Sequence, residues 1–272
     1  MPVDRQQELA RRWPGRTLML EVRDVSKRYG ALTAVSGVSF TVKPGEVLGY
    51  LGPNGSGKST TVKMIVGLMR PTSGLVLYEG ADIQNALVAY KAAVGYVPED
   101  GYLYTYLTAP EYLRLTGRLR GLAEATLEAK INRLLKLFGL DADYHARLAA
   151  FSKGMRQKIH IAAALLHNPR VVVLDEPVSG LDLSTALVLR AVVKRLAAAH
   201  RVVFYSSHEL DTIEKISTRV IILRSGRIVA DDSAARLREL MRLPSLEDVF
   251  AELAVRENVD QVADELVSTI ES

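Results

Sequence analysis

The chain has 272 residues, of which 48% are hydrophobic and 24% are charged, a composition ordinary for a globular protein with a sizeable core. Its formal net charge of +4 is too small to indicate nucleic acid or an anionic membrane surface as a partner. The absence of cysteine excludes disulfides and thiolate metal sites, and no uninterrupted apolar run approaches the ~18 residues that predict a transmembrane helix.

The first part of the chain predicts a lead-in followed by strands. Residues 1–17, broken at Pro14 and Gly15, lack the order of charged, apolar and small residues that marks a signal peptide. Four short apolar stretches follow, separated by turn signals such as Lys43-Pro44-Gly45, and we expect them to form β-strands. They are LMLEVRDV, AVSGVSFTV, EVLGYLG and GLVLYEG.

A helical region is expected from about residue 100 to residue 166. Thr108 and Glu111 have the spacing of a capping box, with a proline inside the first turn. Apolar residues between Leu127 and Phe138 then recur at helical spacing and are closed by Gly139. Ser152 is placed to cap a helix that runs to Leu166.

Strands and helices alternate in the rest of the chain. The apolar stretches RVVVLDEP and RVVFYSS suit parallel strands buried on both faces, with helices expected around residues 186–199 and 210–216. RVIILRSGRIVADD adds further strands. Residues 231–272 are expected to form a helical tail that is acidic from Glu247 onward. The whole pattern predicts an α/β fold with a helical insert.

The segment GPNGSGKS, residues 52–59, matches the phosphate-loop pattern G-x-x-x-x-G-K-[ST] between a predicted strand and a predicted helix. Its glycines let backbone N–H groups curve around a triphosphate. Lys58, expected at an exposed loop–helix junction, adds charge to the outer phosphates, and the Ser59 hydroxyl can bind Mg²⁺. The sequence therefore predicts a nucleotide site, although such a loop alone does not say what the nucleotide drives.

A second anchor lies in VVVLDEP, where Asp175 and Glu176 follow four apolar residues. This places them at the carboxyl end of a buried strand, where α/β sheets bind ligands. Asp175 can hold Mg²⁺, and Glu176 can polarise a water for in-line attack. The alternative, an acidic turn before Pro177, is weakened by the phosphate loop. A water-activating base favours hydrolysis over transfer to an acceptor.

FSKGMRQ, residues 151–157, has two interpretations. Ser152 can be a helix cap, or it can present the helix N-terminus to a phosphate. Residues 18–230 help here, because their motifs resemble those of the nucleotide-binding subunit of an ATP-binding cassette (ABC) transporter. The motifs that carry the resemblance are, in order, Tyr29, GPNGSGKST, GYVPED, FSKGMRQ, VVVLDEP, SGLD and SSHEL.

The resemblance implies a fold and a site. The fold would be a P-loop ATPase with a mixed, mostly parallel core sheet, an antiparallel β subdomain and an α-helical subdomain. FSKGMRQ occupies the place of the family signature LSGGQ, so Ser152 and Gly154 would contact the γ-phosphate of ATP held by a second protomer. Asp182 would lie at the dimer seam, and His208 would touch the γ-phosphate and position the attacking water. The implied ATP-binding residues of the chain itself are Tyr29, which would stack on adenine, Gly52, Pro53, Asn54, Gly55, Ser56, Gly57, Lys58, Ser59, Thr60 and Glu99.

Glu99, in GYVPED, departs from the glutamine usual in the family, and Phe151, Lys153 and Met155 depart from the usual signature. Similar departures occur in exporter-type cassettes whose permease is a separate chain. The implied metal ligands are Ser59, Asp175 and Glu99. The catalytic residues would be Glu176, His208 and Lys58.

The expected function is that of an ATP-hydrolysing subunit that needs ATP and Mg²⁺. It would pair with itself or with a second ATPase subunit, and would attach to the cytoplasmic side of the cell membrane through a separate permease, with no nucleic acid partner. The alternatives are a soluble ABC ATPase of DNA repair or translation and a nucleotide-gated interaction module that does not hydrolyse ATP. The cargo is not encoded here, because the permease would recognise it.

Two groups of residues have weaker assignments. Four histidines show no metal-ligand spacing and are expected to be structural; they are His145, His160, His167 and His200. An aromatic cluster just after Glu99 either belongs to the core of the helical region or forms a contact surface for a helix of the membrane partner. Its members are Tyr102, Tyr104, Tyr106 and Leu107.

Overall fold

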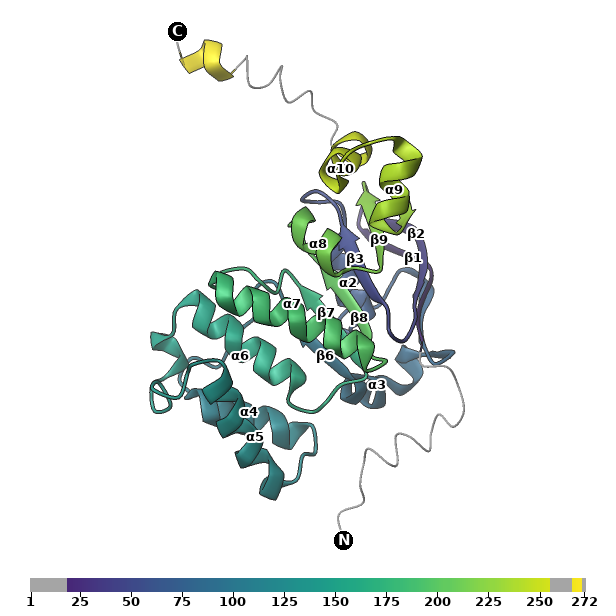
Figure 1. Cartoon of the computed structure of the whole chain (residues 1–272). Helices are drawn as coiled ribbons and strands as arrows, with labels where there is room; N and C mark the ends of the chain where they lie inside the picture. Colours follow the sequence, from purple (N-terminus) through teal and green to yellow (C-terminus); the bar gives the residue numbers. More distant parts are fainter. Residues whose placement is uncertain (1–18, 255–265, 271–272) are drawn as a thin grey trace.

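The computed structural model describes residues 19–254 and 266–270 of the chain. The predicted lead-in, residues 1–17, and part of the predicted tail lie outside the described residues. Within the described residues the chain forms two β-sheets with helices around them (Figure 1). No helix in this part of the chain is both long enough and apolar enough to cross a membrane.

One sheet is antiparallel and has the strand order β2-β1-β4-β5. Its strands are β1 (Leu20–Tyr29), β2 (Leu32–Val42), β4 (Ser73–Tyr78) and β5 (Ala81–Asp82). The alternating apolar residues of β1 and β2 explain the arrangement, because one face of each strand is buried against the rest of the molecule. The predicted strands of this region are therefore confirmed, whereas β5 was not predicted.

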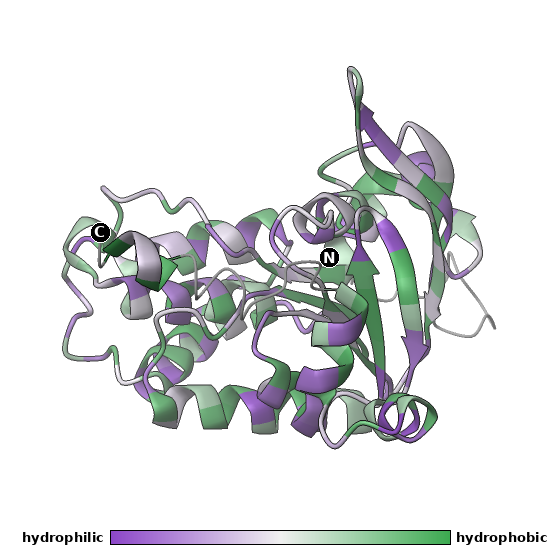
Figure 2. Ribbon diagram, turned by 90° about the horizontal axis from the view of Figure 1, so that it is seen from above, coloured by the Kyte–Doolittle hydropathy of each residue, from purple (hydrophilic) through white to green (hydrophobic). Residues whose placement is uncertain are grey.

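The central sheet has the order β10-β9-β3-β8-β7-β6 and is parallel except for β10, which pairs antiparallel with β9. Its strands are β3 (Val47–Leu51), β6 (Val94–Val97), β7 (Val171–Asp175), β8 (Val202–Ser206), β9 (Arg219–Arg224) and β10 (Arg227–Asp232). Every residue of β3, β7 and β8 is buried, as the uniform apolar runs predict. Hydrophobic colouring accordingly follows the central strands in Figure 2.

Helices cover the central sheet and form a separate group beside it. Next to the strands lie α2 (Lys58–Ile65), α3 (Leu87–Ala93), α7 (Leu183–Ala198), α8 (Leu210–Ile216), α9 (Ala234–Met241) and α10 (Leu246–Ala254), with the short 3₁₀ turn η1 (Ile83–Ala86) before α3. The predicted helical region contains α4 (Ala109–Leu119), α5 (Glu124–Leu137), the 3₁₀ turn η2 (Leu148–Ala150) and α6 (Lys153–Leu165). The α4, α5 and α6 helices share a hydrophobic cluster of their own around Leu113, Leu127 and Ile159. The capping box predicted at Thr108 and Glu111 is present.

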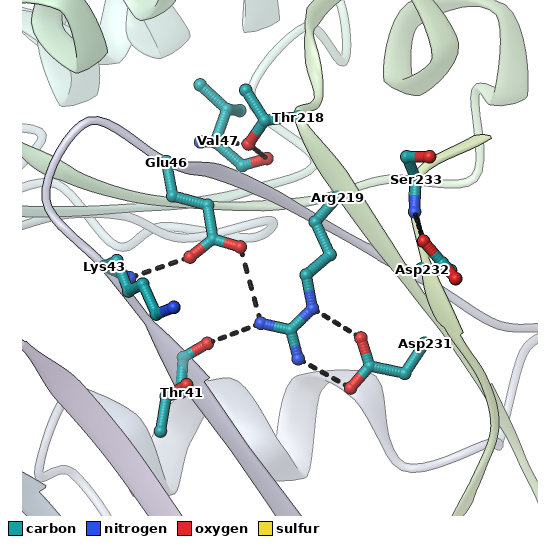
Figure 3. A network of polar contacts seen from close by, with 9 residues as sticks. All are labelled: Thr41, Lys43, Glu46, Val47, Thr218, Arg219, Asp231, Asp232 and Ser233. Carbon is teal, nitrogen blue, oxygen red and sulfur yellow. Dashed lines mark hydrogen bonds and ion pairs between the residues drawn. The ribbon is translucent and has the colours of Figure 1, made fainter. Parts of the chain in front are cut away.

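Arg219 ties the two sheets together at the start of β9 (Figure 3). Its guanidinium makes a bidentate pair with Asp231 of β10, at 2.5 and 2.6 Å. It also donates to the carbonyl oxygen of Thr41 in β2 over 2.9 Å, and lies 3.4 Å from Glu46. Because an arginine fork holds its partners in fixed directions, this network helps to hold the antiparallel sheet against the central one, together with the hydrophobic cluster that the two sheets share.

Candidate functional site

The phosphate loop, residues 52–57, connects the end of β3 to the start of α2. Its glycines are required where the loop approaches other backbone. A Cβ at Gly52 would lie 2.6 Å from the Leu223 carbonyl oxygen. A Cβ at Gly57, whose φ is +105°, would lie 2.5 Å from the Ala34 carbonyl oxygen. A larger side chain at either position would push the loop away from its supports, so the motif folds as the tight strand–loop–helix unit that phosphate binding needs.

Gly226, in the turn between β9 and β10, also supports the loop. Its N–H donates to the Ser56 carbonyl oxygen over 2.9 Å, and its carbonyl accepts from the Ser36 N–H of β2 over 2.8 Å. Its φ is +77°, and a Cβ there would lie 2.7 Å from the Ala34 carbonyl oxygen. Gly226 therefore joins the phosphate loop to β2. Sequence analysis missed it, because a glycine in a hairpin turn looks like an ordinary turn signal.

Lys58 is buried, which corrects the expectation that it occupies an exposed junction. Its side chain folds back along the loop, and Nζ donates to the carbonyl oxygens of Gly52 and Pro53 over 2.5 and 3.3 Å. Burial lowers the pKa of Lys58, and the negative charges of Glu176, Asp175 and Glu99 oppose that shift. The charges of the lysine and of the three carboxylates are therefore close enough to influence one another.

Those carboxylates meet because neighbouring parallel strands end at the same edge of the sheet. Asp175 ends β7, Glu176 follows it, and Glu99 lies two residues beyond β6, the strand paired with β7. Burial raises the pKa of Asp175 to about 6, and Glu99 and Glu176 raise it further, while Ser206 and Lys58 oppose the shift. The site concentrates more negative than positive charge, so it favours a cation.

Glu176 is held through both its backbone and its side chain. Its φ of +46° is in the left-handed region, which is uncommon for a residue with a side chain. One carboxylate oxygen, Oε1, lies 2.8 Å from Nδ1 of His208, and the other, Oε2, accepts from the Ser207 hydroxyl over 3.1 Å. Glu176 is buried, whereas the side chain of His208 is 73% exposed. Glu176, the predicted base, and His208, predicted to position the attacking water, are therefore neighbours.

A pocket of about 660 Å³ brings most of the predicted site together. Its lining includes Tyr29, Glu99, Glu176 and His208, together with most of the phosphate loop and the start of α2. The residues lining it from the loop and helix are Gly52, Pro53, Asn54, Gly55, Gly57, Lys58, Ser59 and Thr60. Ser56 and Asp175 are buried behind this surface, each less than 4% exposed.

Tyr29 forms one wall of the pocket at the end of β1. The residue is 46% exposed, and its hydroxyl donates to the sulfur of Met69 over 3.0 Å. The Nζ of Lys27 lies 5.5 Å from the ring centroid. One edge of the ring is therefore anchored while much of its surface is open to the pocket, an arrangement that suits stacking on a flat base.

Three further lining residues were not predicted as site residues. Leu32 and Ala34 follow Tyr29 on β2, and Phe250 comes from α10 in the predicted tail. Phe250 packs partly against the hydrophobic core, and α10 is tied to β9 because Arg224 donates to the Leu253 carbonyl oxygen over 2.8 Å. Their apolar side chains carried no chemical motif, so only the tertiary arrangement identifies them.

Ser152, Gly154 and Asp182 do not line this pocket. Ser152 caps α6, with its Oγ accepting from the Met155 N–H over 3.2 Å. A Cβ at Gly154 would lie 2.4 Å from the Gly180 carbonyl oxygen, so the start of α6 packs closely on the segment before Asp182. The structure thus brings these three residues together as a second group, separate from the pocket residues of the same chain.

Asp182 caps α7 and also bridges to α6. Its carboxylate accepts from Ser184 and Thr185, and these hydrogen bonds hold its pKa well below its usual range. One of its oxygens lies 3.5 Å from Nζ of Lys158 on α6. The side chain therefore links the N-terminus of α7 to the body of α6.

The donors around the carboxylates fit Mg²⁺. Ser59, Asp175 and Glu99 supply oxygen atoms only, which are the ligands that a hard cation prefers. Within residues 19–254 and 266–270, no three His, Asp or Glu side chains close into a metal cage of their own. Mg²⁺ commonly takes one or two carboxylates and completes its shell with water and substrate phosphates, so an open set of this kind suits it.

Comparisons with known proteins agree with this geometry. A family model described as ABC transporter matches residues 35–179. The ABC transporter ATP-binding protein NatA of Bacillus subtilis (strain 168) is 36% identical over 244 residues, covering 88% of this chain and 99% of that protein. The Nod factor export ATP-binding protein I of Paraburkholderia xenovorans (strain LB400) is 33% identical, covering 80% of this chain and 72% of that protein. A solved structure of an ATP-binding subunit of an ABC transporter superposes with a TM-score of 0.81 at 36% identity, covering 87% of this chain and 99% of that one.

Proposed function

Because this chain belongs to the ABC transporter family as an ATP-binding, ATP-hydrolysing subunit, we propose that the pocket between Tyr29 and His208 is its ATP site and that the hydrolysis powers export through a separate permease. The family, the fold class and the ATPase activity predicted from the sequence are confirmed by these matches. A soluble ABC ATPase of DNA repair or translation is not favoured, because the relatives are transporter subunits.

One observation carries the assignment of the site. One pocket is lined by an aromatic ring, a phosphate loop, a buried carboxylate and a histidine. These are the groups needed to bind the adenine ring and the phosphates of ATP and to activate the water that attacks the γ-phosphate. In this proposal Tyr29 stacks on adenine, and backbone N–H groups of residues 52–60 bind the phosphates. Lys58 shifts its Nζ from the loop carbonyls to the outer phosphates.

The proposed Mg²⁺ ligands are the Ser59 hydroxyl and the Asp175 carboxylate, with Glu99 beside them. When bound, Mg²⁺ would neutralise charge on the outer phosphates and lower the barrier to their displacement. The support from this chain is the oxygen-only donor set and the raised pKa of Asp175, which reflects a buried carboxylate among other carboxylates. A divalent cation would relieve that repulsion.

Hydrolysis follows from the position of Glu176. A water in line with the γ-phosphate would give its proton to the Glu176 carboxylate as its oxygen bonds to phosphorus, while the bond between phosphorus and the leaving ADP oxygen breaks. His208, paired with Glu176 through Nδ1, would use its exposed ring to hold the γ-phosphate and orient the water. The chain thereby supplies both the base and the group that aligns its target.

Ser152, Gly154 and Asp182 would act on the nucleotide of a second protomer. The support is their placement outside the pocket of their own chain, at the N-terminus of α6 and beside it. A helix N-terminus offers unpaired N–H groups and a positive dipole end to an anion, and Lys153 adds positive charge there. Two chains, or this chain and a second ATPase subunit, would therefore close around two ATP molecules.

A separate permease is the proposed membrane partner, and it would hold the subunit on the cytoplasmic side of the membrane. The exporter relative supports the direction of transport. An exposed aromatic surface, Tyr102, Tyr104 and Tyr106, supports a docking site, because these residues are 82%, 46% and 66% exposed rather than buried in the helical core. Their rings lie 6.3 and 5.9 Å from one another in sequence order. Exposed tyrosines of this kind are typical of protein interfaces.

Mixing two inactive variants should recover ATP hydrolysis if the composite site is real. Lys58→Ala chains have an intact signature, and Ser152→Arg chains have an intact phosphate loop, so a mixed dimer contains one site with both. We expect the steady-state ATPase rate of the mixture to exceed the sum of the two variants measured separately, provided that one working site suffices.

The matched control adds the Ser152→Arg change to the Lys58→Ala chain, and this double variant should give no recovery with Lys58→Ala. Equal activity per chain from a demonstrably monomeric wild-type protein would contradict the arrangement between two protomers.

Asp175→Asn should stabilise the protein without ligand at pH 8 but not at pH 4. The pKa of Asp175 in the folded chain is raised to about 6 from 3.8. The contribution of protonated Asp175 to the free energy of unfolding is therefore fully present below the pKa of the unfolded chain and is lost as pH rises through about 6. Asparagine carries no charge and avoids that loss. Thermal melting across this pH range would measure the difference.

Addition of Mg²⁺ and ATP should reverse the order at pH 8, because a charged carboxylate binds Mg²⁺ more strongly than a neutral amide does. A variant that gained as much thermal stability from Mg²⁺ and ATP as the wild type would show that Asp175 is not a ligand.

A further inference from the structure

We propose that Ser207, a buried residue of the SSHEL motif that has no role assigned so far, positions the carboxylate of Glu176 for hydrolysis. This proposal rests on the proposed role of Glu176 as the general base. Three consecutive residues at the end of β8 hold Glu176 in three different ways. Ser206 binds its backbone, Ser207 binds one carboxylate oxygen, and His208 lies against the other.

The backbone of Glu176 needs such support. Its φ of +46° is in the left-handed region, where a Cβ comes too close to the backbone and the conformation is strained. The Glu176 N–H donates to the Ser206 carbonyl oxygen over 2.9 Å, and the Glu176 carbonyl accepts from the Ser179 N–H over 3.2 Å. These bonds fix where the side chain starts, but the carboxylate at its end could still rotate.

Ser207 removes that rotation. Its hydroxyl oxygen accepts from the Glu209 N–H over 3.0 Å, so its single proton is free to point at the Oε2 atom of Glu176, 3.1 Å away. The residue is fully buried, so water does not compete for this bond. With Oε2 engaged, the other oxygen faces His208, whose exposed ring lines the pocket.

The arrangement also connects the base to the segment that carries His208. Ser207 accepts from Glu209 at the start of α8, and the Glu209 carboxylate accepts from Thr212 over 2.8 Å. A displacement of this segment would move His208 and would change the hydrogen bond to Glu176 at the same time. Ser207 therefore orients the carboxylate of Glu176 with respect to His208.

Ser207→Ala should lower kcat for ATP hydrolysis by at least about 10-fold, since a hydrogen bond to a charged group is stronger than one between neutral groups. The KM for ATP and the dissociation constant for ATP should stay within about twofold of wild type, because the variant leaves the phosphate loop intact. Ser217→Ala is the matched control. Ser217 follows the C-terminal end of α8, and its buried hydroxyl has no hydrogen-bond partner among the described residues. Its removal should leave kcat unchanged.

The double variant Glu176→Gln with Ser207→Ala separates positioning from a general structural role. If Ser207 acts through the base, its removal should not lower the single-turnover hydrolysis rate of Glu176→Gln any further. An unchanged kcat in Ser207→Ala would overturn the inference, and so would a further 10-fold loss in the double variant. If Glu176→Gln itself hydrolyses ATP normally, the proposed function of Glu176 fails, which is a result distinct from either of these.

Discussion

Glu176→Gln is expected to lower the rate of ATP hydrolysis by about 10²–10⁴, the usual effect of removing a general base. Glutamine has nearly the same shape and can still accept hydrogen bonds, so it fits between Ser207 and His208 without rearrangement of either residue. Asp175 is unchanged, and ATP should still bind with Mg²⁺. The measurements are the steady-state ATPase rate and the ATP dissociation constant.

The same variant should form a lasting dimer with ATP. Hydrolysis would normally reopen the two-chain assembly, so a chain that binds ATP without cleaving it should elute as a dimer in size-exclusion chromatography. In the absence of a permease, wild type should elute mostly as a monomer. Dimer formation by Glu176→Gln in ADP alone would show that the assembly does not depend on uncleaved ATP.

Glu99→Gln is the control for the base, because Glu99 is the other ionisable carboxylate among the described residues that line the pocket. It follows β6 and is exposed, whereas Glu176 is buried and bonded on both oxygens. We expect Glu99→Gln to keep most of its hydrolysis activity. Loss of turnover in Glu99→Gln together with normal turnover in Glu176→Gln would mean that Glu99 is the base.

Lys58→Ala should weaken ATP binding by about 10–100-fold and reduce hydrolysis further, since a charge-assisted bond to a phosphate contributes about 1.5–3 kcal/mol. Stability should change little. Two hydrogen bonds to loop carbonyls are lost, but so is a buried charge whose desolvation lowers its pKa. Titration with ATP and a thermal melt of the same sample measure both effects.

Lys63→Ala provides the comparison for Lys58→Ala. Lys63 is an exposed lysine on the same helix α2, so its replacement removes one positive charge without touching the loop. Its ATP affinity should equal that of wild type. A collapse of the thermal transition in Lys58→Ala would show that the buried lysine is needed for folding, and its effect on ATP could then not be assigned to phosphate contacts.

Much of the fold was predictable because its strongest signals are local. The uniform apolar runs of β7 and β8 and the capping box at Thr108 depend on residues close together in the sequence. The region from β5 to β6 was not predicted. There α3 runs directly into β6 between Ala93 and Val94, with no loop residue between the helix and the strand. The helix–strand change is decided by pairing of β6 with β7, which is a long-range contact.

The residues of the candidate site likewise fall into those that the sequence could predict and those that it could not. Residues that belong to a spaced motif, such as Lys58, Asp175 and Glu176, could be found from the sequence because their chemistry needs that spacing. The folded-back position of Lys58 and the roles of Ser207 and Gly226 could not. Each depends on a hydrogen bond between segments that are distant in the sequence or on a carbonyl oxygen that no side-chain pattern reveals.

The bridges made by Arg219 and Gly226 have a consequence for which ligands the pocket accepts. Arg219 locks β2 to the central sheet, and Gly226 locks β2 to the phosphate loop. Tyr29, just before β2, is therefore held in place relative to the loop. In the proposed ATP site, this spacing would have to match the distance between the adenine ring and the phosphates of the nucleotide. A nucleotide with one phosphate fewer would then still contact Tyr29 and the phosphate loop, but it would place no phosphate beside Glu176 and His208.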